Sequence, residues 1–554
     1  MSPRLSLRSR SGTLRLTVAA GLSAIALLGV PVLAKAERPN IVIIQTDDQN
    51  ARTVRSTFRK ASGQKARIMP NTLREIFGAG TEFQNYYATS PICSPSRASL
   101  LSGQYPHNNG LIENDAPYGG WDAWQNLPSY SQNLPVALQS AGYRTSHFGK
   151  FINGYYDSEA GQAETVVPPG WDNWYTNSFF KGALYYGFEV NNNGVLNTGF
   201  GDPLYEYDSG LDPKRCDVET LTRQRFAYGC NHLTDTMTRA AVREIRKNQS
   251  EPLFMQIDYQ APHGDVRAPV GPQPASRHAG AMSRTSLPRP ANYNEADVSD
   301  KSELIQSYAT PRLDYQRNQR LKRTYRRYIA SLRAVDDGVG AIIKTLRNTG
   351  KLDDTYIFFL SDHGYFLGEH RFDKAKFLPY DASARVAMAV RGPEVPVGGR
   401  SEELVGNVDI APTALQIAGV TGELDVDGRS INRFWKDPLR SSRRPLGLAL
   451  SPEPPEESSG GASVSASAPV LRYDGFMVGP YKYFRFDDGG EAELYDMDRD
   501  PWELENVIDS PEYVQVKQYM EAFLPQVGDC AGVDCRLWLP KWPEPALEEL
   551  PPES

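Results

Sequence analysis

Beyond residue 36 the sequence lacks any apolar run long enough to span a membrane, so no stable membrane anchor is expected. It also lacks internal repeats. With 40% hydrophobic and 23% charged residues among 554, the composition is typical of a globular protein and not of a disordered or fibrous one. The length allows one large domain with an appendage, or two to three ordinary domains.

Positive charge is also scarce. The chain has 60 basic against 67 acidic residues, a net charge of −7. Residues 1–36 hold five of the basic residues and no acidic one, so without them the balance is 55 to 67, or −12. A field of this sign repels polyanions, which argues against nucleic acid or anionic membranes as general partners. An anionic substrate would have to be captured by a local site.

The first 36 residues have the pattern of an export signal. A basic start (MSPRLSLRSR) leads into the apolar stretch LTVAAGLSAIALLGVPVLA and then Ala34-Lys35-Ala36. This pattern predicts cleavage near Ala36 and a secreted protein, extracellular or periplasmic. A retained anchor helix is the alternative, since the apolar stretch approaches spanning length. Pro31 and the Ala-x-Ala end favour cleavage.

Cysteines are few, five in all. Cys216 with Cys230 and Cys530 with Cys535 each bracket a short loop, so both pairs are plausible local disulfides in an oxidising compartment. Buried free thiols are the alternative, and the connectivity stays open. In either case Cys93 is the cysteine left over.

Short apolar runs that end in polar residues alternate with helical patterns. Three such runs, residues 40–46, 253–259 and 355–360, each precede a charged or polar group. This alternation predicts an α/β fold with a large mixed, mainly parallel sheet flanked by helices. The expected helices cover residues 134–141, 234–247, 321–347 and 411–418.

The composition changes towards the end of the chain. We expect a catalytic domain over residues 37–445 and a C-terminal subdomain over 446–540, where alternating residues predict a small antiparallel sheet. Within the subdomain, residues 452–469 are rich in Pro, Glu, Ser, Gly and Ala and are predicted to form a flexible surface loop. Residues 541–554 form a tail.

The most informative segment is Cys93-Ser94-Pro95-Ser96-Arg97. Pro95 suits the first turn of a helix, which puts Cys93 at or just before the N-cap. A group there faces unpaired backbone N–H donors and the positive end of the helix dipole, which favour developing negative charge. A cysteine in such a position could act as a thiolate nucleophile of low pKa.

This segment resembles the signature of the sulfatase family, which has an alkaline-phosphatase-like fold. The resemblance implies that a formylglycine-generating enzyme oxidises Cys93 to formylglycine during biosynthesis. One hydroxyl of the aldehyde hydrate would attack sulfur, and the other would then expel sulfate and restore the aldehyde, which is covalent catalysis. Arg97 would anchor the hydrate.

The resemblance also implies a metal site. Asp47 and Asp48 match the family's first pair of ligands, and Asp362 and His363 match the second. Together with the oxygen at position 93 they make a site dominated by hard oxygen ligands, suited to Ca²⁺ first and to Mg²⁺ or Mn²⁺ second. Taken singly, each pair would more often be an ordinary turn at a strand end.

Three further residues are implied as sulfate contacts. Lys150 resembles the family's first sulfate-binding lysine, and Lys376 fits the spacing of the second better than Lys374 does. His263, in Ala-Pro-His, resembles the histidine that contacts the ester and could protonate the leaving oxygen. We interpret the remaining histidines near these motifs as structural, namely His107, His147 and His370.

One position departs from the common pattern. Many sulfatases have a histidine two residues after the first lysine, whereas this chain has Ile152 followed by Asn153. The arrangement resembles the N-acetylglucosamine-6-sulfatases and extracellular heparan 6-O-endosulfatases. It implies a sulfated sugar of the glucosamine 6-sulfate type as substrate, with aryl sulfates as a further candidate. Asn153 is then a candidate replacement for the missing hydrogen-bonding group.

Two other functions compete with a sulfatase. One is a phosphodiesterase or phosphonate hydrolase of the same superfamily, and the other is a sulfated-glycan binding protein that has lost turnover. The cysteine in its Pro-Ser-Arg context favours sulfate. The complete set of expected catalytic and metal residues argues against a decayed enzyme.

Overall fold

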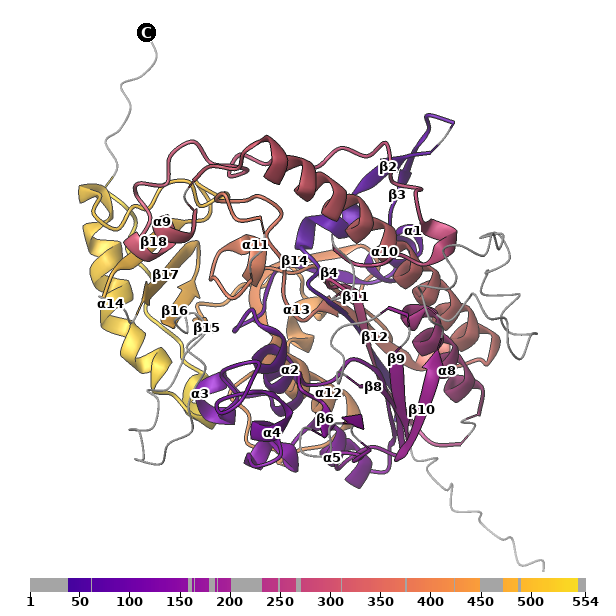
Figure 1. Cartoon of the computed structure of the whole chain (residues 1–554). Helices are drawn as coiled ribbons and strands as arrows, with labels where there is room; N and C mark the ends of the chain where they lie inside the picture. Colours follow the sequence, from indigo (N-terminus) through magenta and orange to yellow (C-terminus); the bar gives the residue numbers. More distant parts are fainter. Residues whose placement is uncertain are drawn as a thin grey trace, which may run out of the picture. The chain divides into compact units, whose positions relative to one another are not determined.

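The strand predicted at residues 40–46 forms β1 (Asn40–Asp47), which lies inside a ten-stranded sheet (Figure 1). Its two neighbours are the other predicted strands, β11 (Leu253–Pro262) and β12 (Thr355–Ser361), and both run parallel to it. The order is β10-β9-β8-β5-β11-β1-β12-β13-β4-β14. The other strands are β4 (Thr81–Tyr87), β5 (Arg144–Gly149), β8 (Asn173–Asn177), β9 (Phe188–Asn192), β10 (Val195–Phe200), β13 (Met388–Arg391) and β14 (Gly399–Gly406).

Figure 1 is a computed structural model. It describes residues 38–546 apart from 61, 158–161, 164, 179–184, 187, 201–231, 248–249, 266–270, 310, 374–375, 423, 449–471 and 487–489. Several predictions lie outside the described residues: the signal at 1–36, the Cys216–Cys230 pair, Lys374, the loop at 452–469 and the end of the tail from residue 547.

Both faces of the sheet are buried, as is usual for a mainly parallel sheet. Alternate residues of β1 serve two cores: Val42 and Ile44 pack on one face, Ile41 and Ile43 on the other. On the Val42 face lie α8 (Leu233–Lys247) and α10 (Tyr315–Asn348), which contact each other and β11 (Figure 1). On the Ile41 face lie α2 (Cys93–Ser102), α5 (Leu134–Ser140) and α12 (Ile410–Ala418). The predicted fold class is confirmed.

The four predicted helices are present, and one boundary is wrong. The helix expected from residue 321 begins at Tyr315, because Asp314 caps it by accepting a hydrogen bond from the Arg317 amide at 2.7 Å. The added first turns are polar and partly exposed, so they carry no apolar periodicity that would have indicated a helix. The short elements are α1 (Pro70–Thr72), α3 (Pro106–Asn109), α4 (Gly120–Trp124), α9 (Glu303–Ala309), α11 (Asp381–Ala384), α13 (Asn432–Lys436), β2 (Thr57–Arg59), β3 (Lys65–Arg67), β6 (Tyr156–Asp157) and β7 (Gln162–Ala163).

A second, antiparallel sheet follows near the C-terminus, as predicted. It contains β15 (Leu446–Leu448), β16 (Tyr473–Val478), β17 (Tyr481–Phe486) and β18 (Ala492–Asp496), and α14 (Val514–Gly528) contacts it (Figure 1). The predicted Cys530–Cys535 disulfide is confirmed, with an S–S distance of 2.07 Å. Cys93 is the free cysteine of the described part of the chain. Among the described residues, no helix is long and apolar enough to cross a membrane.

A buried ion cluster joins this second sheet to the rest of the fold. The Lys482 ammonium on β17 lies 2.6 Å from Asp381 of α11 and 2.7 Å from Glu503, and all three side chains are buried. Lys482→Met should therefore leave two carboxylates without their shared cation. We expect a loss of about 3–5 kcal/mol in the free energy of unfolding, measured by denaturant titration.

Lys517 on α14, whose side chain is 32% exposed, provides the control for Lys482→Met. Its ammonium lies 3.4 Å from Asp509, whose side chain is 90% exposed. Lys517→Met should change stability by only about 0–1 kcal/mol. Equal losses in the two variants would show that the buried cluster contributes no more than a surface pair.

Candidate active site

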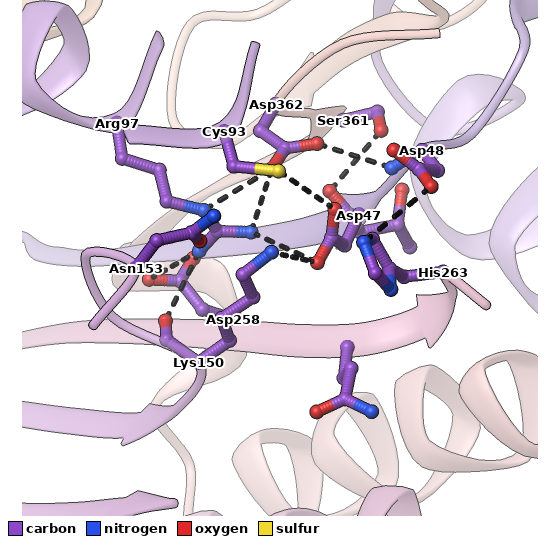
Figure 2. A network of polar contacts seen from close by, with 12 residues as sticks. Asp47, Asp48, Cys93, Arg97, Lys150, Asn153, Asp258, His263, Ser361 and Asp362 are labelled. Carbon is purple, nitrogen blue, oxygen red and sulfur yellow. Dashed lines mark hydrogen bonds and ion pairs between the residues drawn. The ribbon is translucent and has the colours of Figure 1, made fainter. Parts of the chain in front are cut away.

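Parallel strands deliver the predicted residues to one edge of the large sheet. Asp47 ends β1, Lys150 follows β5, His263 follows β11 and Asp362 follows β12. Because these four strands are neighbours, their carboxyl ends bring together side chains that are far apart in sequence. Ligands in open α/β sheets bind at such an edge. Figure 2 shows these side chains around Cys93.

The backbone at two strand ends is adapted to these positions. Asp48 has a φ of 68°, a left-handed conformation that is uncommon for residues other than glycine, Asn and Asp and that recurs at functional sites. Gly149 has a φ of 112°, and a Cβ there would lie 2.0 Å from the Asp258 carbonyl oxygen. Only glycine lets β5 approach β11 this closely just before Lys150.

Cys93 lies in the first turn of α2, one position further into the helix than predicted. The N-cap is Ile92, and the Ser96 amide donates to its carbonyl at 3.0 Å. All ten residues of α2 are buried. The Ser96 hydroxyl donates to the Asp362 carbonyl at 2.5 Å, which ties the helix start to the end of β12.

The Cys93 sulfur is surrounded by cations and acids. It lies 3.2 Å from the Lys376 ammonium, 3.3 Å from Nε2 of His363 and 3.8 Å from a carboxylate oxygen of Asp47. Burial opposes a thiolate, but Lys150 and Lys376 lower the pKa of the Cys93 thiol below its ordinary value. The position therefore favours an anion on the side chain at residue 93.

Four of the five predicted metal ligands form a compact group. One donor atom each from Asp47, Asp48, Cys93 and His363 lies within 4.8 Å of the others, and all four residues are buried. Two oxygens bound to one Ca²⁺ at 2.3–2.6 Å can be at most about 5 Å apart, so the group fits one cation. Burial opposes charge on His363, yet Asp362 and Cys93 raise its pKa to about 9, so a cation would compete there with a proton.

Asp362 differs from the other four. Its Oδ2 accepts two hydrogen bonds from Arg97, at 2.8 and 3.1 Å, and its Oδ1 accepts from the backbone amides of His363 and Asp48 at 2.8 and 3.2 Å. Oδ1 also lies 3.7 Å from Nε2 of His363. Asp362 thus borders the four-residue group and holds Arg97 beside it.

Arg97 is fully enclosed by acceptors. Besides Asp362, its guanidinium donates to the Lys150 carbonyl at 3.0 Å and lies 3.6 Å from Asp258 and 3.9 Å from Asp47. Its side chain is only 2% exposed. A buried guanidinium fixed on several sides is a rigid anchor for an anion at position 93.

The two predicted lysines contact different acids of the same group. Lys150 donates to Asp47 at 2.5 Å, and Lys376 donates to Asp48 at 2.9 Å. Burial opposes the charge on Lys376, but Asp48 raises its pKa well above the ordinary value. Lys376 is 15% exposed and Lys150 is fully buried, so Lys376 is the more accessible of the two.

The choice between Lys376 and its neighbour can be tested directly. Lys376→Ala should lower kcat/KM for a sulfate ester by on the order of 10²–10³-fold, because it removes a charged donor at the reacting group. Lys374→Ala is the matched control and should change kcat/KM little. Equal losses would show that the assignment of this loop is wrong.

His263 lies at the edge of the group, with Nε2 3.8 Å from Asp48 and a side chain 23% exposed. Its Nδ1 lies 2.8 Å from the Gly264 carbonyl, which can only accept. Nε2 therefore carries a proton only when the ring is charged. Burial lowers the pKa of His263, whereas Asp48 and Asp47 act in the opposite direction.

Asn153 lies beside the start of α2, as Figure 2 shows. Its backbone N–H donates to the Ser94 hydroxyl at 3.0 Å. Its side-chain Oδ1 is buried without a hydrogen-bond partner among the described residues. Ile152 is fully buried in the core on the Ile41 face of the sheet. Of Ile152 and Asn153, only Asn153 therefore offers a polar side chain near the four-residue group.

The three histidines interpreted as structural differ in how close their partners lie to the site. His107 lies 2.8 Å from the Cys530 carbonyl, and His370 lies 2.6 Å from Glu295, both in the packing of other elements. His147, by contrast, lies 3.0 Å from Asp258, the carboxylate next to Arg97. Sequence reasoning missed Asp258, because the burial that makes this acid unusual is visible only in the structure, where all ten residues of β11 are buried.

Comparison with known proteins identifies the family. The family model described as Sulfatase matches residues 39–420, which is more than half of the chain and includes every residue discussed above from Asp47 to Lys376. The chain belongs to the sulfatase family. The predicted enzyme class, a sulfuric ester hydrolase, is thereby confirmed.

Curated relatives agree with the family. The sulfatase is 30% identical to an arylsulfatase of Volvox carteri over 92% of its own length and 78% of the relative's. It is 29% identical to human N-acetylglucosamine-6-sulfatase, with coverages of 91% and 87%. It is 30% identical to the extracellular sulfatase SULF-1 homolog of Drosophila melanogaster over 72% of its own length, but spans only 31% of that protein.

Solved structures share the fold. One is in complex with its substrate D-glucosamine-2-N,6-O-disulfate and is 24% identical, with a TM-score of 0.65 and coverages of 89% of the sulfatase and 97% of that chain. A phosphonate monoester hydrolase of Agrobacterium radiobacter is 20% identical, with a TM-score of 0.57 and coverages of 88% and 95%. These likenesses concern the fold.

Proposed function

We propose that the sulfatase removes sulfate from sulfated sugars with a formylglycine made from Cys93 as the nucleophile. The observation that carries this proposal is the setting of Cys93, buried at a helix start within 3.3 Å of Lys376 and His363. Formylglycine would supply an aldehyde hydrate, one hydroxyl of which attacks sulfur while the other expels sulfate afterwards. A formylglycine-generating enzyme is then a partner during maturation.

The chain's own cations prepare the nucleophile and the sulfate. Arg97 orients the group at position 93, because Asp362 and the Lys150 carbonyl hold its guanidinium in place. Lys150 and Lys376 flank that group and can neutralise the sulfate oxygens as negative charge develops on them. His263, at the edge, would in its charged form give the proton on Nε2 to the leaving ester oxygen.

A divalent cation would be held by Asp47, Asp48, His363 and the oxygen at position 93, with Asp362 at the border. The carboxylates and the space between the donor atoms favour Ca²⁺, with Mg²⁺ or Mn²⁺ as alternatives. The cation would polarise the nucleophile and offset the charge of the sulfate.

The proposed substrate is a sugar sulfated in the manner of glucosamine 6-sulfate. Two findings support it: a relative named N-acetylglucosamine-6-sulfatase that aligns over most of both chains, and a neighbour bound to its substrate D-glucosamine-2-N,6-O-disulfate. The relative named arylsulfatase supports aryl sulfates as a second candidate substrate. The extracellular relative and the N-terminal pattern support secretion.

Sulfate release from a panel of defined esters tests this proposal. The panel should hold glucosamine 6-sulfate, galactosamine 6-sulfate, an aryl sulfate and the aryl phosphate diester and phosphonate of the same alcohol. We expect the highest kcat/KM for glucosamine 6-sulfate. Faster cleavage of the phosphorus esters would favour the phosphonate hydrolase, and tight sugar binding without any release would favour a binding protein.

A further inference from the structure

We propose that Asp258 sets the charge of the sulfate pocket, so that it favours monoanionic sulfate esters over dianions such as the product, inorganic sulfate. This inference rests on the proposed function, because it takes the group around Cys93 as the sulfate site. Asp258 is outside the set of residues that the family resemblance implied. It acts through Arg97 and is therefore a specificity-determining residue and not a catalytic one.

Asp258 is built into the wall of the site. It lies inside β11 and is 1% exposed, and its carboxylate is 3.6 Å from the Arg97 guanidinium. Its carbonyl accepts the Lys150 amide at 2.8 Å, so one residue touches both the anchor arginine and the backbone of the first lysine. Figure 2 shows Asp258 close to Arg97 and Lys150.

Neutral donors hold the same carboxylate oxygen that faces Arg97. Gln256 donates to Oδ2 of Asp258 at 2.9 Å, and Nε2 of His147 lies 3.0 Å from the same oxygen. Nδ1 of His147 lies 2.6 Å from the Thr176 hydroxyl, and its ring stacks on Trp174 at 4.6 Å. These contacts orient Asp258 without supplying a second formal charge, because burial lowers the pKa of His147 and keeps the ring neutral.

The charges in the pocket explain why an additional acid matters. Three side-chain cations surround position 93, namely Arg97, Lys150 and Lys376, and the acids in contact with them are Asp47, Asp48, Asp362 and Asp258. After His263 has given up its proton, and with an uncharged hydrate at position 93, one divalent cation and a neutral His363 as its ligand, five positive charges face these four carboxylates.

One positive charge then remains, which matches a sulfate monoester. A dianion would leave the pocket negative. Removing the Asp258 charge should strengthen the binding of every anion, and of dianions most, because the Coulomb energy scales with the ligand's charge. The intact residue would thus speed release of inorganic sulfate after each turnover.

The test compares two anions that differ in charge, inorganic sulfate and methyl sulfate. Asp258→Asn and Asp258→Ser remove the charge with different side-chain volumes. Dissociation constants are measured by calorimetry in the Cys93→Ala background with Ca²⁺ present, so the result does not depend on turnover. We expect the affinity for sulfate to rise about tenfold relative to methyl sulfate in both variants.

Asp337→Asn is the control for overall charge. Asp337 is a partly buried acid paired with Arg277 in another cluster, at 3.0 Å, and its replacement should leave the sulfate-to-methyl-sulfate ratio unchanged. An unchanged ratio in the folded Asp258 variants would overturn the inference, as would failure of both variants to fold, which would make Asp258 a structural residue. A shifted ratio, together with no sulfate release by the matured protein that keeps Cys93, would contradict only the proposed function.

Discussion

Cys93→Ala is expected to lower the rate of sulfate-ester hydrolysis by on the order of 10⁴-fold or more, since it removes the nucleophile itself. The fold should persist, because the sulfur contacts Lys376, His363 and Asp47 and is not part of either hydrophobic core. Steady-state kinetics on a glucosamine 6-sulfate substrate, with thermal unfolding in parallel, measures both effects.

Ser102→Ala is the control for Cys93→Ala. Ser102 is buried at the other end of α2, and its hydroxyl donates to the Ala98 carbonyl at 2.8 Å. This variant should keep wild-type rates. Substantial turnover by folded Cys93→Ala would remove position 93 from the chemistry and with it the proposed mechanism.

Asp48→Asn should lower both the bound metal and the activity. The change replaces a carboxylate with a weaker neutral ligand, and asparagine tolerates the left-handed backbone at this position, where φ is 68°. Metal catalysis contributes several kcal/mol of transition-state stabilisation, so we expect the rate to fall by on the order of 10³-fold. Elemental analysis of the dialysed protein measures the metal independently of the rate.

Asp337→Asn again provides the comparison, because it removes a carboxylate from a cluster formed by Arg277 and His278. It should retain the metal and the activity. Excess Ca²⁺ should partly restore Asp48→Asn by mass action. Full metal content in Asp48→Asn with unchanged activity would show that the cation, if one is needed, binds elsewhere.

The residues at strand ends could be predicted from the sequence because each carries a local signal. Asp47 and Asp362 follow strands whose apolar runs stand out, and Cys93 precedes a proline that suits a helix start. The alternation of strands and helices predicts a mainly parallel sheet, and such a sheet gathers the strand ends at one edge. These patterns indicate where the site lies, whereas the roles of the individual residues came from the resemblance to the sulfatase family.

Asp258 and His147 could not be assigned in this way. Each lies within a strand, where successive side chains point to opposite faces of the sheet, and the contact between them depends on the parallel register of β11 with β5. That register is set by packing across the whole sheet and leaves no pattern in either segment. The start of α10 was missed for a related reason, since a cap and a polar first turn determine it.

The most direct test is the mass of the peptide that contains Cys93, taken from protein made together with a formylglycine-generating enzyme and active on sulfate esters. An aldehyde or its hydrate at position 93, in a fraction that rises with specific activity, is the predicted result. A peptide that carries only the thiol, from protein that releases sulfate at full rate, would contradict the central claim.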